Sequence, residues 1–294
     1  MNRFLFLLIF SSIFIQSCDD GDIIVRSFNF DNAELKTCGD VGNYVFYKVN
    51  PDSKESLSLK MEVLDSLYRE EGIVNYTLNG STIVVDYRTY DAALGNNYFC
   101  SSIPPTSPNV TVEYVASSGT AVFTTTFLIE DNDGVPREFE FAGDTDGDGL
   151  DDMYDFDDDG DNVPTVFELN LEDDDEDPFS NPKDTDGDGV PDFLDNDDDN
   201  DGVLTRFEDE NLDLDPKNDI TDPTVGPDYL NPEVANTYEV YQHQPHEYQI
   251  FKSVQITLKD LVLVRGDEQI IIETLDMGTI ENVEIITKTV TPQP

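Results

Sequence analysis

The sequence predicts a mainly β protein in which two β units flank a strongly acidic central segment. Two observations lead to this fold class. On both sides of the centre, polar and apolar residues alternate over short runs, which is typical of half-buried strands. In the centre, residues 144–215 hold 31 of the 64 Asp and Glu of the chain, against two basic residues. We therefore expect a β-sandwich domain over 18–140, an acidic array over 141–224 and a β domain over 225–294.

The first residues have the pattern of an export signal. A short basic start precedes the apolar stretch Phe4–Ile15, which is too short to cross a bilayer, so we expect a signal peptide over 1–17. The stretch ends in Ile15-Gln16-Ser17-Cys18, which resembles the lipobox of bacterial lipoproteins. The resemblance implies cleavage before Cys18 and acylation of its thiol. The alternative is an ordinary secreted protein with an incidental cysteine.

Short strands are expected between Ile23 and Glu130. Ser56–Val63 and Asn109–Val115 alternate cleanly, and Asn79-Gly80 between two apolar runs indicates a type I′ hairpin. About six to eight such strands with turns between them are typical of an immunoglobulin-like sandwich.

Cysteine usage supports an oxidising compartment. The chain has three cysteines. With Cys18 acylated, Cys38 and Cys100 remain as an even pair, and we expect them to form a disulfide. The alternative is two free buried thiols.

Four 12-residue segments of the acidic centre repeat one pattern of carboxylates. Each has Asp at positions 1, 3 and 5 and a carboxylate at position 12, and three of the four have Gly at position 6. A solvated, disordered acidic run is the alternative, but random acidity would not keep this phase four times. The repetition indicates a modular array.

The spacing matches the chemistry of Ca²⁺, which takes six to eight oxygen ligands at about 2.3–2.6 Å. A 12-residue loop supplies them from the side chains at positions 1, 3, 5, 9 and 12 and from the carbonyl oxygen at position 7, so we expect about four ions. The predicted ligands are Asp144, Asp146, Asp148, Leu150, Asp152 and Asp155 in loop 1; Asp157, Asp159, Asp161, Val163, Thr165 and Glu168 in loop 2; Asp184, Asp186, Asp188, Val190, Asp192 and Asp195 in loop 3; and Asp197, Asp199, Asp201, Val203, Thr205 and Glu208 in loop 4.

Two departures from the pattern affect individual loops. Loop 2 has Asn162 at position 6, and asparagine tolerates the left-handed backbone that glycine provides there. Loops 1 and 3 end in Asp rather than Glu, which weakens the expectation that the closing carboxylate binds through both oxygens.

The loops follow one another too closely for EF-hands. One residue, Phe156 or Asn196, separates the loops of each pair, so no entering helix fits. The pattern resembles the thrombospondin type 3 repeat, in which Asp-x-Asp-Gly-Asp-Gly-x-x-Asp-x-x-Asp runs into another Asp-x-Asp-x-Asp. The resemblance covers about 144–223 and implies a chain wrapped around calcium ions, with little regular secondary structure. Many extracellular members have cysteines inside the repeats and this array has none, so metal alone would hold it.

The C-terminal part is again strand-like from Tyr229 onward. Val254–Leu258 and Val283–Val290 are candidate strands, with Gly266-Asp267 as a turn. These strands are few for an independent sandwich. Three arrangements are therefore open: the strands form a small unit of their own, pack on the first domain, or pack on a partner protein.

The sequence favours a non-catalytic role. It contains no nucleophile–base pair, phosphate loop or cofactor motif, and a net charge of −48 argues against nucleic acid as a ligand. Asp19-Asp20 after the lipobox resembles a surface-export signal of some Gram-negative groups, although in others Asp there indicates retention at the inner membrane. Because calcium is abundant outside the cell, we expect a lipid anchor in the outer membrane and a protein that faces the exterior.

Two functions remain open at this point. The first hypothesis is an accessory subunit of an outer-membrane protein complex or β-barrel that serves assembly, secretion or transport. The second is a cell-surface adhesion or glycan-binding lipoprotein.

Overall fold

The computed structural model describes residues 30–292 except 31, 51, 53, 96, 104, 141–142 and 172–176. Strands make up 38% of the described residues and no α-helix occurs among them, so the mainly β fold class is confirmed. The expected signal peptide and Cys18 lie outside the described residues. Within the part that is described, no helix has the length and apolar character needed to cross a membrane.

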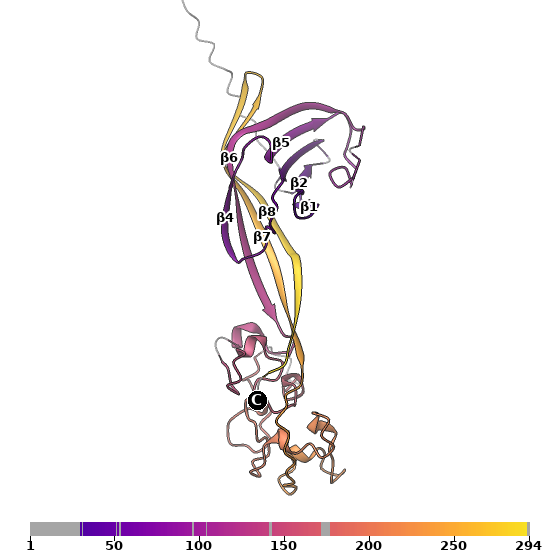
Figure 1. Ribbon diagram of the computed structural model, residues 1–294, viewed down its shortest axis with the longest axis vertical. Helices are drawn as coiled ribbons and strands as arrows, with labels where there is room; N and C mark the ends of the chain where they lie inside the picture. Colours follow the sequence, from indigo (N-terminus) through magenta and orange to yellow (C-terminus); the bar gives the residue numbers. More distant parts are fainter. Residues whose placement is uncertain are drawn as a thin grey trace, which may run out of the picture. The chain divides into compact units, whose positions relative to one another are not determined.

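Eight strands form one sheet (Figure 1). Seven of them follow the order β1-β2-β3-β5-β6-β7-β8, and β4 lies off this path and pairs with β6. The pairs β1–β2, β2–β3, β3–β5 and β5–β6 are antiparallel. The strands are β1 (Lys36–Cys38), β2 (Tyr44–Asn50), β3 (Glu55–Met61), β4 (Gly72–Thr77), β5 (Ile83–Tyr90), β6 (Val110–Glu130), β7 (His246–Arg265) and β8 (Glu268–Val290). The immunoglobulin-like sandwich stays a prediction.

The described residues fall into two compact units. The first holds the described residues up to Arg69, together with Ile73–Thr124 and Gln255–Thr279. The second holds Glu70–Gly72, Thr125–Val254 and the described residues from Ile280 onward. The acidic array therefore lies wholly in the second unit.

The core of the first unit is built on β2, β3 and β6. Leu57 and Leu59 of β3 are fully buried, and the Phe46 ring packs edge-on against Phe123 with centroids 5.3 Å apart. On the other face, Ser56 and Ser58 are also fully buried, and the Ser56 hydroxyl lies 2.9 Å from the Tyr90 hydroxyl. Both faces of β3 are thus covered, whereas its alternating sequence is typical of a strand with one face in solvent.

The C-terminal strands join the N-terminal ones, which is one of the arrangements that the sequence left open. β7 neighbours β6 in the sheet, and the turn between β7 and β8 is at Gly266-Asp267, as expected. Within the first unit, the Tyr114 hydroxyl donates a 2.5 Å hydrogen bond to Glu268. The fully buried Leu258 and Leu263 complete its core.

The hairpin expected at Asn79-Gly80 is wrong. The flanking strands exist, but β4 pairs with β6, while β5 pairs with β3 and β6. The side chain of Asn79 explains the different turn, because its Oδ1 accepts the backbone N–H groups of Ser81, Thr82 and Ile83 at 2.9–3.0 Å. A side chain that binds the following backbone in this way stabilises an Asx turn instead of a hairpin turn.

Cys38 and Cys100 form the expected disulfide, with their Cα atoms 5.7 Å apart and a sequence separation of 62. The double variant Cys38→Ser, Cys100→Ser should lose about 4 kcal/mol of unfolding free energy in the chain-entropy estimate. Urea unfolding followed by near-ultraviolet circular dichroism of the tyrosines measures this loss. Wild type in reducing agent is the control and should match the variant; an unchanged unfolding midpoint in both would contradict the prediction.

Short 3₁₀ turns are the regular structure of the array (Figure 1). Four of them lie in the four loops, at Asp152–Tyr154, Thr165–Phe167, Asp192–Leu194 and Thr205–Phe207, and another, at Asp228–Leu230, follows the array. In the four loops these turns occupy positions 9–11. Among the described residues no helix enters any of the loops, in agreement with the sequence argument against EF-hands.

Candidate metal centre

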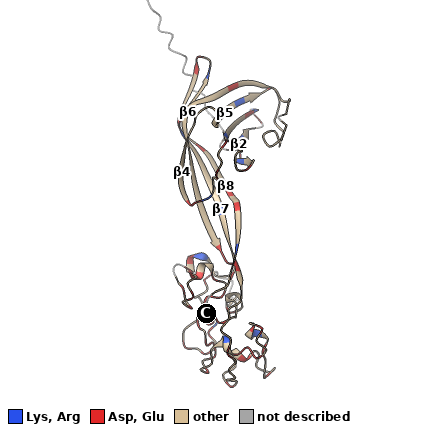
Figure 2. Cartoon of the chain, in the orientation of Figure 1, with Lys and Arg blue, Asp and Glu red and all other residues tan. Residues whose placement is uncertain are grey.

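In each of the four loops, aspartate side chains hold the backbone turn through hydrogen bonds within the loop. Figure 2 shows the acidic and basic residues along the chain. The side chain at position 3 accepts the N–H of position 5, and the side chain at position 5 accepts the N–H of position 7. In loop 3 both bonds, Asp188 to Asp186 and Val190 to Asp188, measure 2.9 Å. The corresponding bonds in loops 1, 2 and 4 measure 2.6–3.3 Å. The 1-3-5 spacing thus sets the backbone path and leaves each of these carboxylates a second oxygen for another partner.

Position 6 requires a left-handed backbone in every loop. Its φ is +97° at Gly149, +74° at Asn162, +101° at Gly189 and +91° at Gly202. Glycine reaches this region without cost, and asparagine is the side chain that tolerates it best. The sequence preference at this position therefore has a conformational cause.

The residue at position 9 stabilises each loop through hydrogen bonds of its backbone N–H and its side chain. Its N–H donates to the carbonyl of the residue before the loop, as from Thr165 to Phe156 at 3.1 Å. Its side chain accepts the N–H of position 2, from Asp158 to Thr165 at 3.1 Å and from Thr185 to Asp192 at 2.7 Å. The ligand role expected of Asp152, Thr165, Asp192 and Thr205 stays a prediction, as does that of the position-7 carbonyl oxygens.

The carboxylates at positions 1, 3 and 5 come together in three loops. One oxygen from each lies within 4.8 Å of the others in the clusters Asp144, Asp146 and Asp148; Asp184, Asp186 and Asp188; and Asp197, Asp199 and Asp201. Such a group of hard oxygens could hold a metal ion.

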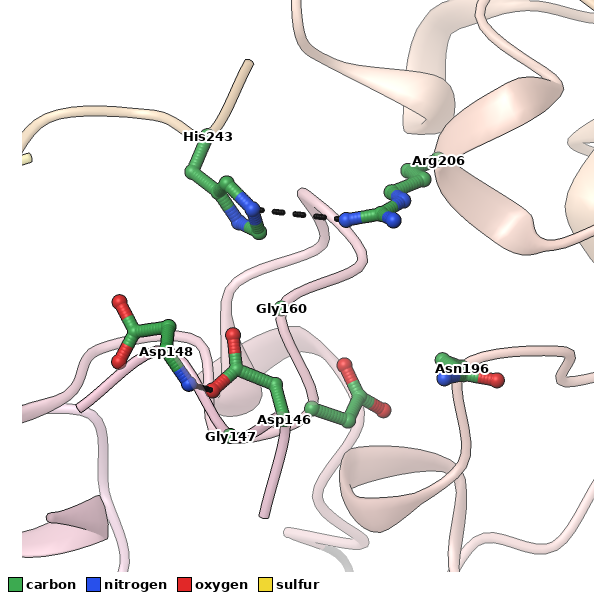
Figure 3. Close-up of a pocket in the computed structure, with 8 residues that line it drawn as sticks. Asp146, Gly147, Asp148, Gly160, Asn196, Arg206 and His243 are labelled. Carbon is green, nitrogen blue, oxygen red and sulfur yellow. Dashed lines mark hydrogen bonds between the residues drawn. The ribbon is translucent and has the colours of Figure 1, made fainter. Parts of the chain in front are cut away.

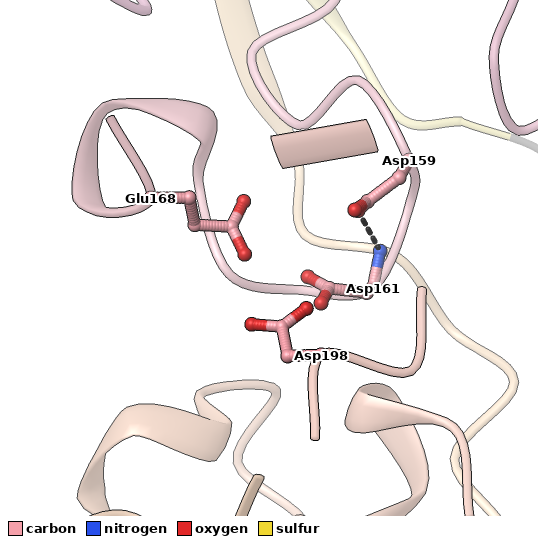
Figure 4. A group of neighbouring side chains, drawn as sticks. All are labelled: Asp159, Asp161, Glu168 and Asp198. Atoms are coloured by element: carbon pink, nitrogen blue, oxygen red, sulfur yellow. Dashed lines mark hydrogen bonds between the residues drawn. The ribbon is translucent and has the colours of Figure 1, made fainter. Parts of the chain in front are cut away.

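The cluster of loop 2 has a member that the sequence pattern missed. Asp159, Asp161 and Glu168 converge with Asp198, which stands at position 2 of loop 4 (Figure 4). The exposed fractions of these four residues range from 0% to 4%. A 12-residue pattern examines each loop alone, so it assigns no role to position 2. The relevant signal is an acidic residue at position 2 of loops 2 and 4, where loops 1 and 3 have threonine.

Buried oxygens without a partner mark the interior of these clusters. Among the described residues, no hydrogen-bond partner exists for Oδ2 of Asp159, Asp161, Asp199 and Asp201, for Oε1 of Glu208, or for either oxygen of Glu168 and Asp198. Buried polar atoms are normally paired, and an unpaired buried carboxylate is costly. Bound cations would supply the missing partners of these oxygens.

The carboxylates at position 12 differ between loops in the number of oxygens that are left for an ion. Oδ1 of Asp155 accepts the N–H of Asp157, and Oδ1 of Asp195 accepts that of Asp197, each at 3.1 Å. One oxygen remains for an ion in loops 1 and 3. Glu168 has both oxygens unpaired among the described residues, which suits bidentate closure of loop 2.

The electrostatics of the metal-free array disfavour ionised carboxylates. Burial, followed by the charges of Asp199 and Asp201, raises the pKa of Glu208 from 4.5 to about 9. Burial, followed by the charge of Asp161, raises the pKa of Glu168 well above its ordinary value.

These pKa shifts predict how the metal-free protein responds to pH. A carboxyl with a raised folded-state pKa binds its proton more tightly in the folded than in the unfolded chain. Its stabilisation is complete below about pH 4.5 and is lost as the pH rises toward about 9, the pKa of Glu208. In protein stripped of metal, the array should therefore keep more structure at pH 5 than at pH 8, which the near-ultraviolet circular dichroism of the tyrosines measures. In saturating calcium the order should reverse, because protons compete with the ion; the same order in both conditions would contradict the prediction.

Asn162 has a second role besides its backbone conformation. Its Nδ2 donates to the Gln242 carbonyl at 3.0 Å, its Oδ1 accepts the Gln244 N–H at 3.0 Å, and its own carbonyl accepts from Gln244 Nε2 at 3.1 Å. Asn162 is fully buried. Asn162 thus binds the segment around Gln242 and Gln244, which leads into β7, to loop 2.

Asn162→Gly should separate the two roles. Glycine keeps the left-handed backbone but removes two side-chain bonds, which costs roughly 1–3 kcal/mol of unfolding free energy. The calcium affinity of loop 2 should change little. Urea unfolding in saturating calcium measures the loss. Gly202→Asn is the matched control, because a Cβ added at that position of loop 4 meets no heavy atom within 4 Å; equal losses in both variants would contradict this role.

A cavity of about 240 Å³ lies beside loops 1 and 2 (Figure 3). It is lined by Asp146, Asp148, Gly160 and Asn196, with Arg206 and His243 opposite, whose Nη1 and Nε2 lie 3.4 Å apart. Burial and the nearby Arg206 charge lower the pKa of His243. The neutral histidine and the guanidinium place one positive charge against the acidic loops.

Comparison with protein-family profiles, curated proteins and solved structures finds no match to this chain.

Proposed function

We propose that this protein is a non-catalytic, calcium-binding lipoprotein of the outer membrane. In this proposal the four loops form a structural connector, a segment whose loops are held together by bound calcium ions. The observation that carries the proposal is the set of buried carboxylate oxygens without partners in the loop clusters. They converge on the points where a 12-residue calcium loop holds its ion.

The donor set favours calcium over other metals. Every clustered side chain offers carboxylate oxygen, and no Cys or His is part of the clusters of the four loops described above. Zinc prefers nitrogen and sulfur ligands, and magnesium keeps several waters in a strict octahedron. Calcium accepts many carboxylates in a flexible shell, which suits clusters of three and four acids.

The loops suit a structural connector better than a sensor. A sensor EF-hand opens a groove by moving an entering helix, and the described residues contain none. Calcium loops of extracellular modules bind at about 10⁻⁴–10⁻³ M, so they stay filled outside the cell. This assignment agrees with the resemblance to thrombospondin type 3 repeats.

The proposed setting is the outer face of the outer membrane, with Cys18 carrying lipid. The role that we favour is an accessory subunit of an outer-membrane complex or β-barrel, with the β strands as the contact surface. The second candidate, an adhesion or glycan-binding lipoprotein, is favoured by the exposed aromatic side chains of the second unit, of which Phe167 is 59% and Tyr241 51% exposed.

Purification from membranes tests the two roles. The tagged, acylated protein is isolated in calcium and in chelator, and the co-purifying proteins are identified and quantified. A stoichiometric membrane partner that is lost in chelator supports the accessory role. A monomer that has no such partner and instead binds a purified glycan supports the adhesion role and overturns the first.

A further inference from the structure

Three buried carboxylates lie directly after strand β6, outside the four loops. Asp131, Asp133 and Glu140 are 4, 0 and 6% exposed, and one oxygen from each lies within 4.8 Å of the others. Among the described residues, Asp131 Oδ2, Asp133 Oδ2 and Glu140 Oε1 have no hydrogen-bond partner. Three buried acids with unpaired oxygens in one place carry more negative charge than the nearby Arg137 offsets.

The segment repeats the later part of a calcium loop. Asp131–Glu140 and Asp199–Glu208 have the same residue at seven of ten positions, Asp-Asn-Asp-Gly-Val at the start and Phe-Glu at the end. The bonds repeat too: Asp133 N–H donates to Asp131 at 3.2 Å and Val135 N–H to Asp133 at 2.8 Å. Position 1 of this partial loop is Ile129, which is why the 1-3-5-12 pattern does not find it.

Asp158 occupies the same place in loop 2 as Asp198, which completes the cluster of loop 2, occupies in loop 4. Both stand at position 2 of a later loop, and both have their N–H held by the threonine at position 9, at 3.1 and 3.3 Å. Asp158 is 3% exposed and its Oδ1 has no partner among the described residues. The two segments lie against each other, because a Cβ added at Gly134 would lie 3.1 Å from Leu169 Cδ1 and 3.5 Å from Val166 Cγ2.

We propose that Asp131, Asp133, Glu140 and Asp158 bind a fifth calcium ion, which fastens the first residues after β6 to loop 2. The identity of the metal rests on the proposed function of the array, whereas the position of the site rests on its own residues. The ion binds just before the array, in a segment that has Ile129 instead of an aspartate at position 1 of the loop pattern.

Counting ions on the intact chain tests the site. The probe is Ca²⁺ alone, with native mass spectrometry of wild type and of the double variant Asp133→Asn, Glu140→Gln. The asparagine that replaces Asp133 keeps a side-chain oxygen to accept the Val135 N–H, so the turn is preserved. We expect the variant to hold one ion fewer than wild type. The control Glu138→Gln removes a charge from the same segment outside the cluster and should leave the number unchanged.

Trypsin locates the effect, because Arg137 lies inside the proposed site and Lys183 and Arg206 lie in the array. In calcium, cleavage after Arg137 should appear in the double variant while Lys183 and Arg206 stay protected. An unchanged ion count with Arg137 protected overturns the fifth site. Loss of several ions with cleavage throughout the array also overturns it as a local site. Failure of the proposed function is distinct, since wild type itself would then hold no calcium.

Discussion

Removal of calcium is expected to unfold the acidic array and to leave the first unit folded. Residues 144–215 carry 31 acidic and two basic side chains, so four Ca²⁺ would offset eight of 29 net negative charges. At a tenfold excess over its dissociation constant, each ion contributes about 1.4 kcal/mol, or roughly 6 kcal/mol for four. That is comparable to the whole stability of many domains, about 5–15 kcal/mol. Binding free energy in such a segment is folding free energy.

Trypsin digestion in calcium and in EGTA measures this effect at defined sites. Arg137, Lys183, Arg206 and Lys217 are the basic residues between Glu130 and Leu230, and each should be protected in calcium and cleaved in EGTA. The disulfide-linked first unit should survive as a large fragment in both conditions. Restored calcium should restore protection, and magnesium at the same concentration is the control for non-specific charge screening. Protection of all four sites in EGTA would contradict a metal-held array.

The clustering of carboxylates within single loops could be predicted from sequence because its causes are local. Asp at positions 3 and 5 binds backbone N–H groups two residues later, so spacing alone sets the turn and the direction of the remaining oxygens. Asp184, Asp186 and Asp188 come together as expected for this reason. The mainly β character was also predictable, since alternation within a strand is a local property.

Features that depend on distant residues could not be predicted in this way. Asp198 joins Glu168 across 30 positions of sequence, and no pattern confined to 12 residues relates them. The pairing of β4 with β6 instead of β5 is a similar case, because β6 begins only at Val110, far along the chain from the turn at Asn79-Gly80. The burial of both faces of β3 depends on which elements cover the sheet, which its own alternation does not encode.

Asp198→Asn is expected to weaken calcium binding at loop 2 by roughly 100-fold, although Asp198 belongs to loop 4 by sequence. One unit charge at about 4 Å interacts with another by about 4 kcal/mol at an effective dielectric constant near 20, and the amide retains part of this interaction. A loss of about 2.7 kcal/mol corresponds to the expected factor. Calcium titration calorimetry with a competing chelator measures it. Asp151→Asn, which removes an exposed charge from loop 1, is the control and should change the affinity little.

A double-mutant cycle decides to which ion Asp198 belongs. If Asp198 and Glu168 bind the same ion, the effects of Asp198→Asn and Glu168→Gln on calcium affinity should not add, because the first loss already disables the site. Asp198→Asn combined with Asp144→Asn should be additive, since Asp144 belongs to a separate cluster in loop 1. Additivity with Glu168→Gln and coupling with Asp201→Asn would instead assign Asp198 to the ion of loop 4. Because Asp198 and Glu168 come from different repeats, coupling between them would show that one ion holds two loops together, which the proposed connector role requires and a row of independent sites would not show.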